Sequence, residues 1–250
     1  GHVHVVPNAI DLDRFRAAAG RPIRHALGLD GCLVVGFVGW FDRWDRLDLL
    51  LDVTGALRST RPGIRLLLVG DGPVLDQLRE RARGGDLAGC VILTGPVPPA
   101  DVPSYIDAMD VCVLPDSNVF GSPIVLFEFM AMGKAVVGPD VAPIRDVIVD
   151  GANGLVVDRG DVRALTNAVA RLADDPDLRS RLGLAARMGA DRTIDTTKED
   201  AVAVVLGETG GHGADVGLEM SGDPDGVGQA FKILRRGGRA SLLGIPSQPV

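Results

Sequence analysis

The fold is predicted most clearly by residues 111–139, VCVLPDSNVFGSPIVLFEFMAMGKAVVGP. This stretch opens with a short apolar run, Val111–Leu114, which has the length and β-branched content of a buried strand. Turn-forming residues break this run at Pro115–Asn118. Residues 124–132 then have the pattern of a helix, Gly133 fits its C-cap, and a second apolar strand follows. This order predicts a strand-loop-helix-strand unit of a parallel α/β sheet.

The loop between this strand and this helix is a candidate anion site. Gly121, Ser122 and Pro123 lead into the helix, whose unpaired N–H groups and dipole favour a negatively charged ligand. Glu128 follows about one turn later, where its carboxylate can accept hydrogen bonds from a hydroxylated ligand such as a ribose. The same spacing also fits an ordinary strand-loop-helix unit without a ligand, so spacing alone leaves both interpretations open.

The residue pattern is more specific than the spacing. LPDSNxxGSPxxLFExMAMGKxVVxPDxxxIRDVIxDGxNGLxV resembles the C-terminal, donor-binding domain of GT-B retaining glycosyltransferases (glycosyltransferase family four). The resemblance implies that Glu128 holds the ribose of a nucleotide sugar, and that the loop and the backbone of Ile124 and Val125 face its diphosphate. Family members commonly carry a second glutamate, eight positions earlier, that contacts the donor sugar. Here that position is Phe120.

The loop after an earlier strand departs from the family pattern. Residues 32–39 have a buried-strand pattern that ends at Gly39, and Trp40–Arg46 follows as a loop. In the family this loop often carries an arginine and a lysine that neutralise the diphosphate, and the aligned positions here are Trp40 and Asp45. Arg43 and Arg46 lie close by and can substitute, because guanidinium groups pair well with phosphate. A solvated loop of alternating charge is the other interpretation.

A glycine-rich turn follows the next predicted strand, Ile64–Val69. The glycines of Gly70-Asp71-Gly72-Pro73 permit positive φ and close approach of the backbone to a ligand, and such a turn is typical of these donor domains. The expected ligand-binding residues are therefore Gly39, Arg43, Arg46, Gly70, Asp71, Gly72, Gly121, Ser122, Pro123, Ile124, Val125 and Glu128. No catalytic residue is assigned and no cofactor is required.

The resemblance changes at Met188. The last 63 residues, MGADRTIDTTKEDAVAVV and onward, resemble the second half of the NAD-binding domain of zinc-type medium-chain dehydrogenases of the threonine dehydrogenase type. Strands at 191–195, 214–220 and 239–243 with helices at 198–209 and 223–235 predict a βαβαβ half of a Rossmann-like fold. The phosphate turn, acidic ribose residue and zinc ligands of that family lie upstream of this segment. No GxGxxG follows a strand in the chain.

The expected architecture is α/β, with Rossmann-like parallel sheet and helices on both faces. Residues 1–187 form a glycosyltransferase donor domain, and residues 188–250 form a dehydrogenase-like half-Rossmann extension. A lone three-stranded unit of about 60 residues is marginally stable. We therefore expect its strands to join the main sheet or to pair with a second copy of the chain.

The composition indicates the class of protein, its partners and its cellular compartment. Of its 250 residues, 46% are hydrophobic and 24% charged, which is typical of a soluble globular protein. A net charge of −7 argues against nucleic acid as the main partner. Cys32, Cys90 and Cys112 lie in or beside apolar runs without a CxxC pair, which indicates buried free thiols, no zinc site and a reducing compartment. No signal peptide or membrane span is recognised, so we expect a cytoplasmic protein.

Three functions remain open on the sequence. The first is a nucleotide-sugar-binding glycosyltransferase domain, hexosyltransferase-like if active. The acceptor domain that precedes it in the family is not among the 250 residues, so transfer is expected to be impaired unless a second copy or a partner chain completes the cleft. The second is an NAD-dependent dehydrogenase fragment, and the third is an engineered or accidental α/β chimera without catalytic activity.

Overall fold

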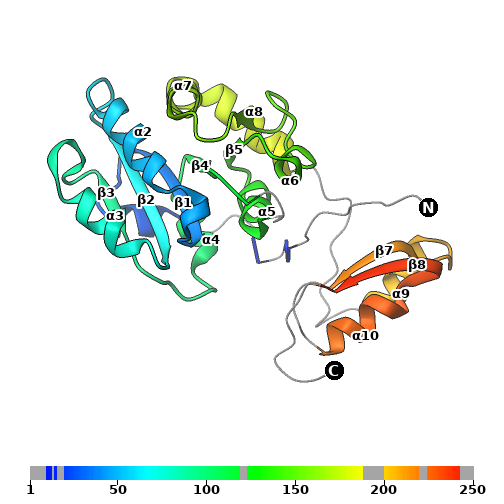
Figure 1. Cartoon of the computed structure of the whole chain (residues 1–250). Helices are drawn as coiled ribbons and strands as arrows, with labels where there is room; N and C mark the ends of the chain where they lie inside the picture. Colours follow the sequence, from blue (N-terminus) through cyan, green and yellow to red (C-terminus); the bar gives the residue numbers. More distant parts are fainter. Residues whose placement is uncertain are drawn as a thin grey trace. The chain divides into compact units, whose positions relative to one another are not determined.

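A computed structural model describes residues 10–12, 14–15, 20–118, 123–187, 200–219 and 224–242 of the chain. The chain divides into two compact units (Figure 1). The larger unit is Arg14–Asp191. The smaller unit combines Gly1–Asp13 with Arg192–Val250.

The larger unit is built on a parallel sheet. Within the described residues its six strands have the order β3-β2-β1-β4-β5-β6. They are β1 (Leu33–Trp40), β2 (Ile64–Asp71), β3 (Val91–Leu93), β4 (Val111–Val113), β5 (Ala135–Pro139) and β6 (Leu155–Val157). Leu66, Leu67, Leu68 and Val69 of β2 are all fully buried. Consecutive buried residues mean that both faces of the sheet are covered, as parallel sheets require.

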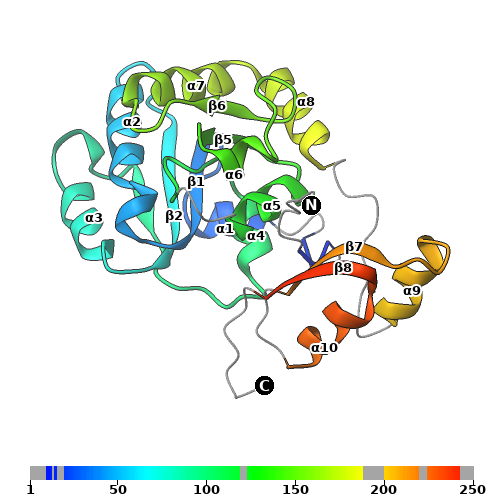
Figure 2. The ribbon, with the colours of Figure 1, turned by 45° about the vertical axis from the view of Figure 1, so that its right-hand side comes forward.

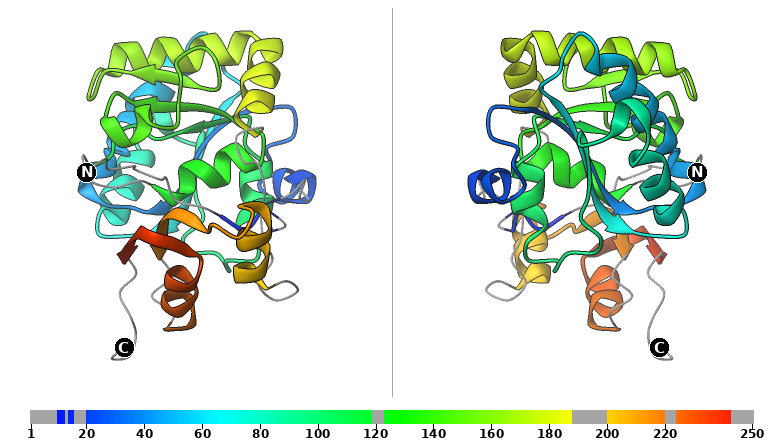
Figure 3. Two further views of the ribbon diagram at one scale, coloured as in Figure 1. Left: turned by 90° about the vertical axis from the view of Figure 1, so that its right-hand side faces the viewer. Right: turned by 90° about the vertical axis from the view of Figure 1, so that its left-hand side faces the viewer.

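Helices cover both faces. They are α1 (Gly20–Ala26), α2 (Asp48–Arg58), α3 (Leu75–Ala82), α4 (Val102–Asp107), α5 (Ile124–Ala131), α6 (Ala142–Arg145), α7 (Val162–Asp174) and α8 (Pro176–Arg187), with the short 3-10 helices η1 (Arg43–Asp45) and η2 (Gly85–Leu87). Helices α2 and α7 pack against each other (Figure 2), while α5 packs on α8 and β5. Figure 3 shows α1 and α3 on opposite sides of the larger unit. Right-handed crossovers that run in opposite directions from β1 account for this division.

The sequence predicted these elements well. The expected fold class, a parallel α/β sheet with helices, is confirmed. The strands expected at residues 64–69 and 111–114 and the helix expected at 124–132 are present within a few residues of the expected bounds. Gly133 ends α5 with a φ of +65°, as its C-cap assignment predicted. Cys90 and Cys112 are buried free thiols, but Cys32 is only half-buried.

The smaller unit contains α9 (Ala201–Glu208), β7 (Ala214–Glu219), α10 (Pro224–Lys232) and β8 (Leu234–Leu242). Strands β7 and β8 pair with each other as a separate parallel sheet within the described residues. The expectation that this segment extends the main sheet is therefore wrong. The third strand expected here, at 191–195, lies outside the described residues.

The boundary between α10 and β8 also differs from the prediction. The helix expected to reach residue 235 ends at Lys232, and the strand expected from residue 239 begins at Leu234. The reason is that Leu234 pairs with Ala214, whose N–H donates to the Ile233 carbonyl over 2.7 Å. The register then shifts before Val216 pairs with Arg239. Gly237, at a φ of +78°, provides the backbone freedom that this irregularity needs.

Candidate functional site

Several of the expected site residues lie at one edge of the sheet. Because all six strands are parallel, their carboxyl ends lie along the same edge. Strand order reverses at β1, which has β2 on one side and β4 on the other. Ligands of open α/β sheets bind outside the carboxyl ends of the strands at such a switch point. Gly39 and Gly70 are register partners there, and the loop 114–118 follows β4.

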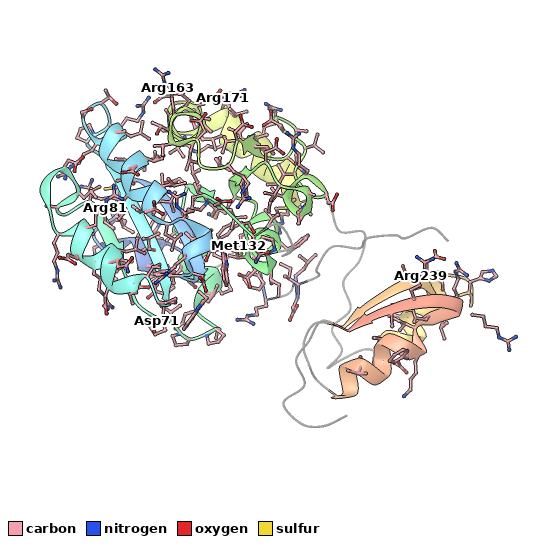
Figure 4. All side chains as sticks on the ribbon, viewed as in Figure 1. Asp71, Arg81, Met132, Arg163, Arg171 and Arg239 are labelled. Carbon is pink, nitrogen blue, oxygen red and sulfur yellow. The ribbon has the colours of Figure 1, made fainter. Side chains whose placement is uncertain are left out.

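The Gly70-Asp71-Gly72 turn is fixed by close backbone packing. Gly70 and Gly72 have φ values of +139° and +155°. A Cβ at Gly70 would lie 1.9 Å from the Gly39 carbonyl oxygen, and one at Gly72 would lie 2.5 Å from the Phe41 backbone. The Phe41 N–H donates to the Asp71 carbonyl over 2.7 Å. Figure 4 labels Asp71, at the end of β2. The predicted positive φ is confirmed, and its structural cause is the contact with the loop after β1.

The loop after β1 forms a 3-10 turn closed by two aspartates. The Arg43 N–H donates to the Asp42 carboxylate over 2.6 Å, and the Asp42 N–H donates to the Asp45 carboxylate over 3.0 Å. Arg46 then adopts a φ of +49°. Its guanidinium donates three hydrogen bonds to Asp48, from Nε to Oδ1 at 3.0 Å and Oδ2 at 3.3 Å and from Nη2 to Oδ2 at 2.8 Å. Much of the charge of Arg46 is therefore already compensated.

A cavity of about 350 Å³ lies between this turn, the start of α2 and one side of α3. It brings together Arg43 and Arg46, the two arginines expected to offset a diphosphate, and adds Arg81 of α3, which the sequence reasoning missed. Arg81 forms an ion pair with Asp52. Arg43 is exposed and makes no ion pair with any described residue. The cavity contains neither Glu128 nor the glycine turn, so the expected residues fall into two groups.

Asp45 gives the strand-end edge an unusual electrostatic character. The pKa of its carboxyl is raised to about 6, mainly by burial and to a smaller extent by the negative charges of Asp42 and Asp116. The hydrogen bond from the Asp42 N–H acts in the opposite direction. The position at which the family resemblance expects a lysine therefore holds a carboxyl group that is mostly ionised at neutral pH.

The loop after β4 is held in place by an ion pair from beyond β6. Asp116 is only 7% exposed. Its Oδ1 accepts from the Ser117 N–H and from Arg159 Nε, both over 2.7 Å. Arg159 Nη2 also donates to the Ser117 carbonyl over 3.2 Å. Neither Asp116 nor Arg159 was identified from the sequence, because their contact spans 43 residues.

Helix α5 carries the expected ribose-binding residue. Pro123 is its N-cap, Ile124 is exposed and Val125 is half-buried. The expected site residues Gly121 and Ser122, and the departure at Phe120, lie outside the described residues. Glu128 is half-buried, and no described residue donates a hydrogen bond to its carboxylate. Burial raises the pKa of this carboxyl, and the positive charge of Arg14 opposes that increase.

Two further searches of the described residues bear on the site. No group of three or more His, Cys, Asp and Glu residues there is arranged to hold a metal ion. Among the same residues, no helix combines the length and apolar character needed to cross a bilayer.

The fold defines a parallel α/β domain whose strand order reverses at β1, and sequence comparison identifies the family. The model of the family described as Glycosyl transferases group 1 matches residues 32–175. This is more than half of the chain, which therefore belongs to that family. A second model, described as Zinc-binding dehydrogenase, matches residues 177–250. The two resemblances expected from the sequence are thus confirmed.

Individual proteins agree with both matches. D-inositol 3-phosphate glycosyltransferase of Acidothermus cellulolyticus is 34% identical over 193 residues, which cover 72% of this chain and 42% of that protein. L-threonine 3-dehydrogenase of Symbiobacterium thermophilum is 42% identical over 106 residues, which cover 42% of this chain and 30% of that protein. The chain thus spans less than half the length of either relative.

A solved structure has the same fold. Anabaena Alr3699/HepE, determined in complex with UDP, superposes with a TM-score of 0.69 at 22% identity. The superposition covers 80% of this chain and 56% of that one.

Proposed function

We propose that the larger unit binds a nucleoside diphosphate, as the leaving part of a nucleotide sugar, at the carboxyl ends of β1 and β4. The proposal rests on the environment of Glu128. A half-buried carboxylate that lacks a donor among the described residues is only partly solvated, and ligand hydroxyl groups would supply donors to it. The ribose of a nucleotide has two adjacent hydroxyls that can donate to it.

The remaining residues are assigned roles from the family resemblance. The first N–H groups of α5, at Ile124 and Val125, lack partners within the helix and face the diphosphate, together with the loop at Gly121, Ser122 and Pro123. Gly39 and the Gly70-Asp71-Gly72 turn border the ligand through their backbone. Arg43 supplies positive charge more readily than Arg46, because Asp48 already binds Arg46. UDP in the Anabaena structure supports a ligand of this class.

We infer that glycosyl transfer by these 250 residues is slow compared with donor binding. Trp40 and Asp45 occupy the positions from which the family neutralises the diphosphate, and Phe120 replaces a glutamate that contacts the sugar. An ionised Asp45 near a diphosphate opposes the charge that develops on the leaving group. The coupling of two family segments in one chain further supports the interpretation that it is a chimera, with a domain boundary at 187/188.

A second candidate function is NAD binding by the dehydrogenase-like segment. The identity of 42% to L-threonine 3-dehydrogenase favours it. The absence of a GxGxxG motif after a strand in the 250-residue sequence weighs against it, because the backbone of that turn holds the pyrophosphate of the cofactor. Residues 243–250, which include the end of the last expected strand, lie outside the described residues.

Thermal-shift titration separates these functions. A ligand that binds the folded state raises the unfolding midpoint by mass action. We expect UDP, GDP or ADP to raise the midpoint, and Glu128→Ala to abolish the shift. Glu80→Ala, which removes an exposed glutamate from α3, is the matched control and should leave the shift unchanged. A shift with NAD alone would favour the dehydrogenase segment, and no shift with any nucleotide would favour an inactive chimera.

A further inference from the structure

Trp40, the last residue of β1, is exposed at the edge where the strands end. Its side chain is 64% exposed, whereas Phe41, the next residue, is fully buried. The Trp40 indole makes no hydrogen bond and no ring contact with any residue that the structure describes. An exposed indole keeps a large apolar surface in water, and a ligand that covers it gains free energy from the burial. Trp40 is therefore a candidate ligand contact.

The alternation of side chains along β1 decides which face of the sheet Trp40 occupies. Phe37 and Phe41 share one face, with their ring centroids 6.0 Å apart. Gly36 and Trp40, each one residue before these, belong to the other face. A Cβ at Gly36 would contact the side chain of Met109, which follows α4. Trp40 thus lies on the face of the sheet that the end of α4 covers.

Helix α5, which carries Glu128, lies on this same face. Lys134, three residues beyond α5, donates from Nζ to the carbonyl of Asp107, the last residue of α4, over 2.8 Å. Figures 1 and 2 show α4 and α5 side by side. Strand β1 also pairs directly with β4, after which the chain leads into α5. Trp40 and the N-terminal end of α5 therefore share one face at one edge of the sheet.

We propose that Trp40 stacks on the sugar ring of the nucleotide sugar, so that the site binds the sugar-bearing donor more tightly than the free nucleoside diphosphate. The proposal rests on the function proposed above, because it extends that ligand beyond its diphosphate. With the ribose at Glu128 and the diphosphate at the first N–H groups of α5, the sugar lies past the helix end, over the carboxyl ends of the strands. The nucleobase lies on the other side of the ribose. An indole has no charge to offset a phosphate, but its face packs well against the C–H groups of a sugar ring.

The first measurement is tryptophan fluorescence, because the sequence contains two tryptophans, Trp40 and Trp44. Emission of the variant Trp44→Phe reports on Trp40, and emission of Trp40→Phe reports on Trp44, which is 52% exposed. Both variants are titrated with UDP, GDP and ADP, and with UDP-glucose, GDP-mannose and ADP-glucose. We expect a bound nucleotide sugar to shift the Trp40 emission to shorter wavelength and to leave the Trp44 emission unchanged. No shift at Trp40 with a nucleotide sugar that binds, or an equal shift with the free nucleoside diphosphate, would overturn the inference.

The second measurement is the affinity of Trp40→Ala and Trp40→Phe for the same ligands. We expect Trp40→Ala to weaken nucleotide-sugar binding about tenfold, from the loss of apolar contact, and to leave the free nucleoside diphosphate nearly unaffected. Trp40→Phe keeps an aromatic ring and should retain most of the affinity. Equal losses for sugar-bearing and free nucleotides would show that Trp40 contacts another part of the ligand or acts only on the fold.

Trp44→Ala is the matched control. It removes the other exposed tryptophan, from the turn η1, whose residue Arg43 lines the cavity beside α2 and α3. We expect it to change neither affinity. Glu128→Ala, in contrast, should weaken both kinds of ligand, because both contain the ribose.

These arms distinguish the inference from the function on which it rests. If the unaltered chain binds neither a nucleoside diphosphate nor a nucleotide sugar, the proposed function is wrong, and the role of Trp40 is wrong with it. If the unaltered chain binds these ligands through Glu128 and Trp40→Ala behaves like Trp44→Ala, only the inference is overturned.

Discussion

Asp45 shows how one side chain changes the character of a strand-end site. Its carboxyl is partly buried beside Asp42 and Asp116, and it occupies the position at which related domains are expected to carry a lysine. A carboxylate there repels a diphosphate, and it also has a cost for the fold, because the ionised form is poorly solvated. Because folding raises the pKa, the ionisation of Asp45 affects the stability of the fold as well as ligand binding.

The first prediction concerns Asp45→Asn and pH. The folded chain binds a proton at Asp45 more tightly than the unfolded chain, because the pKa rises from 3.8 to about 6 on folding. The free energy of unfolding contributed by this group therefore falls as pH increases from about 4 to about 6. Asparagine removes the ionisation and can still accept from the Asp42 N–H. We expect the variant to be about 1 kcal/mol more stable at pH 7, a value discounted for partial exposure of the side chain.

The measurement is urea unfolding of both proteins at several pH values. The stability difference should be near zero at pH 4 and should reach its full value above pH 6. Asp76→Asn, which changes a highly exposed aspartate of α3, controls for net charge. A difference that is constant across this range would show that Asp45 does not titrate as described.

At the scale of the element, helix α8 depends on one glycine. Gly183 faces the end of α5, where a Cβ would lie 2.0 Å from the Gly133 carbonyl oxygen. The two helices therefore touch through their backbones, with Leu182 fully buried beside the contact. The opposing atom belongs to the backbone, so it cannot move aside as a flexible side chain would.

The second prediction is that Gly183→Ala destabilises the larger unit by about 2 kcal/mol, because the added methyl group forces α8 away from α5. Alanine is the better helix former, so a gain of about 1 kcal/mol is expected from propensity alone. The sign of the measured change thus decides whether the close contact exists. Gly63→Ala, at a position with open space around it, is the control and should change little.

Elements and contacts differ in how far the sequence predicts them. Apolar runs such as the one that became β2 indicate buried strands by length and composition alone, and turn residues mark their ends. Contacts between distant segments depend on strand order and helix packing, which spacing does not encode. The contact of Arg159 with Asp116 was missed for this reason, as was the addition of Arg81 to the cavity with Arg43. The start of β8 was missed because pairing with Ala214 determines it.

On the scale of the whole molecule, the two family matches and the two compact units do not divide the chain at the same residue. The glycosyl transferase match ends at 175 and the dehydrogenase match begins at 177, so α8 belongs to the second by sequence. In the fold, however, α8 packs on α5 and β5 of the larger unit. A helix taken from one α/β layer can cover another because both present the same kind of apolar sheet surface.

The last prediction tests where the folded glycosyltransferase-like unit ends. Leu178, Leu182 and Ala186 of α8 are buried in the larger unit. Removing the helix would expose the surface under them at a cost of about 4 kcal/mol. We therefore expect residues 1–187 to unfold with the same urea midpoint as the larger unit of the full chain, and residues 1–175 to be strongly destabilised or unfolded.

If 1–175 cannot be purified, Leu182→Ala in the full chain should lower stability by about 2 to 5 kcal/mol. A fragment 1–175 as stable as 1–187 would place the boundary at the junction of the two family matches, and an unfolded 1–187 would mean that the larger unit requires the dehydrogenase-like segment in order to fold.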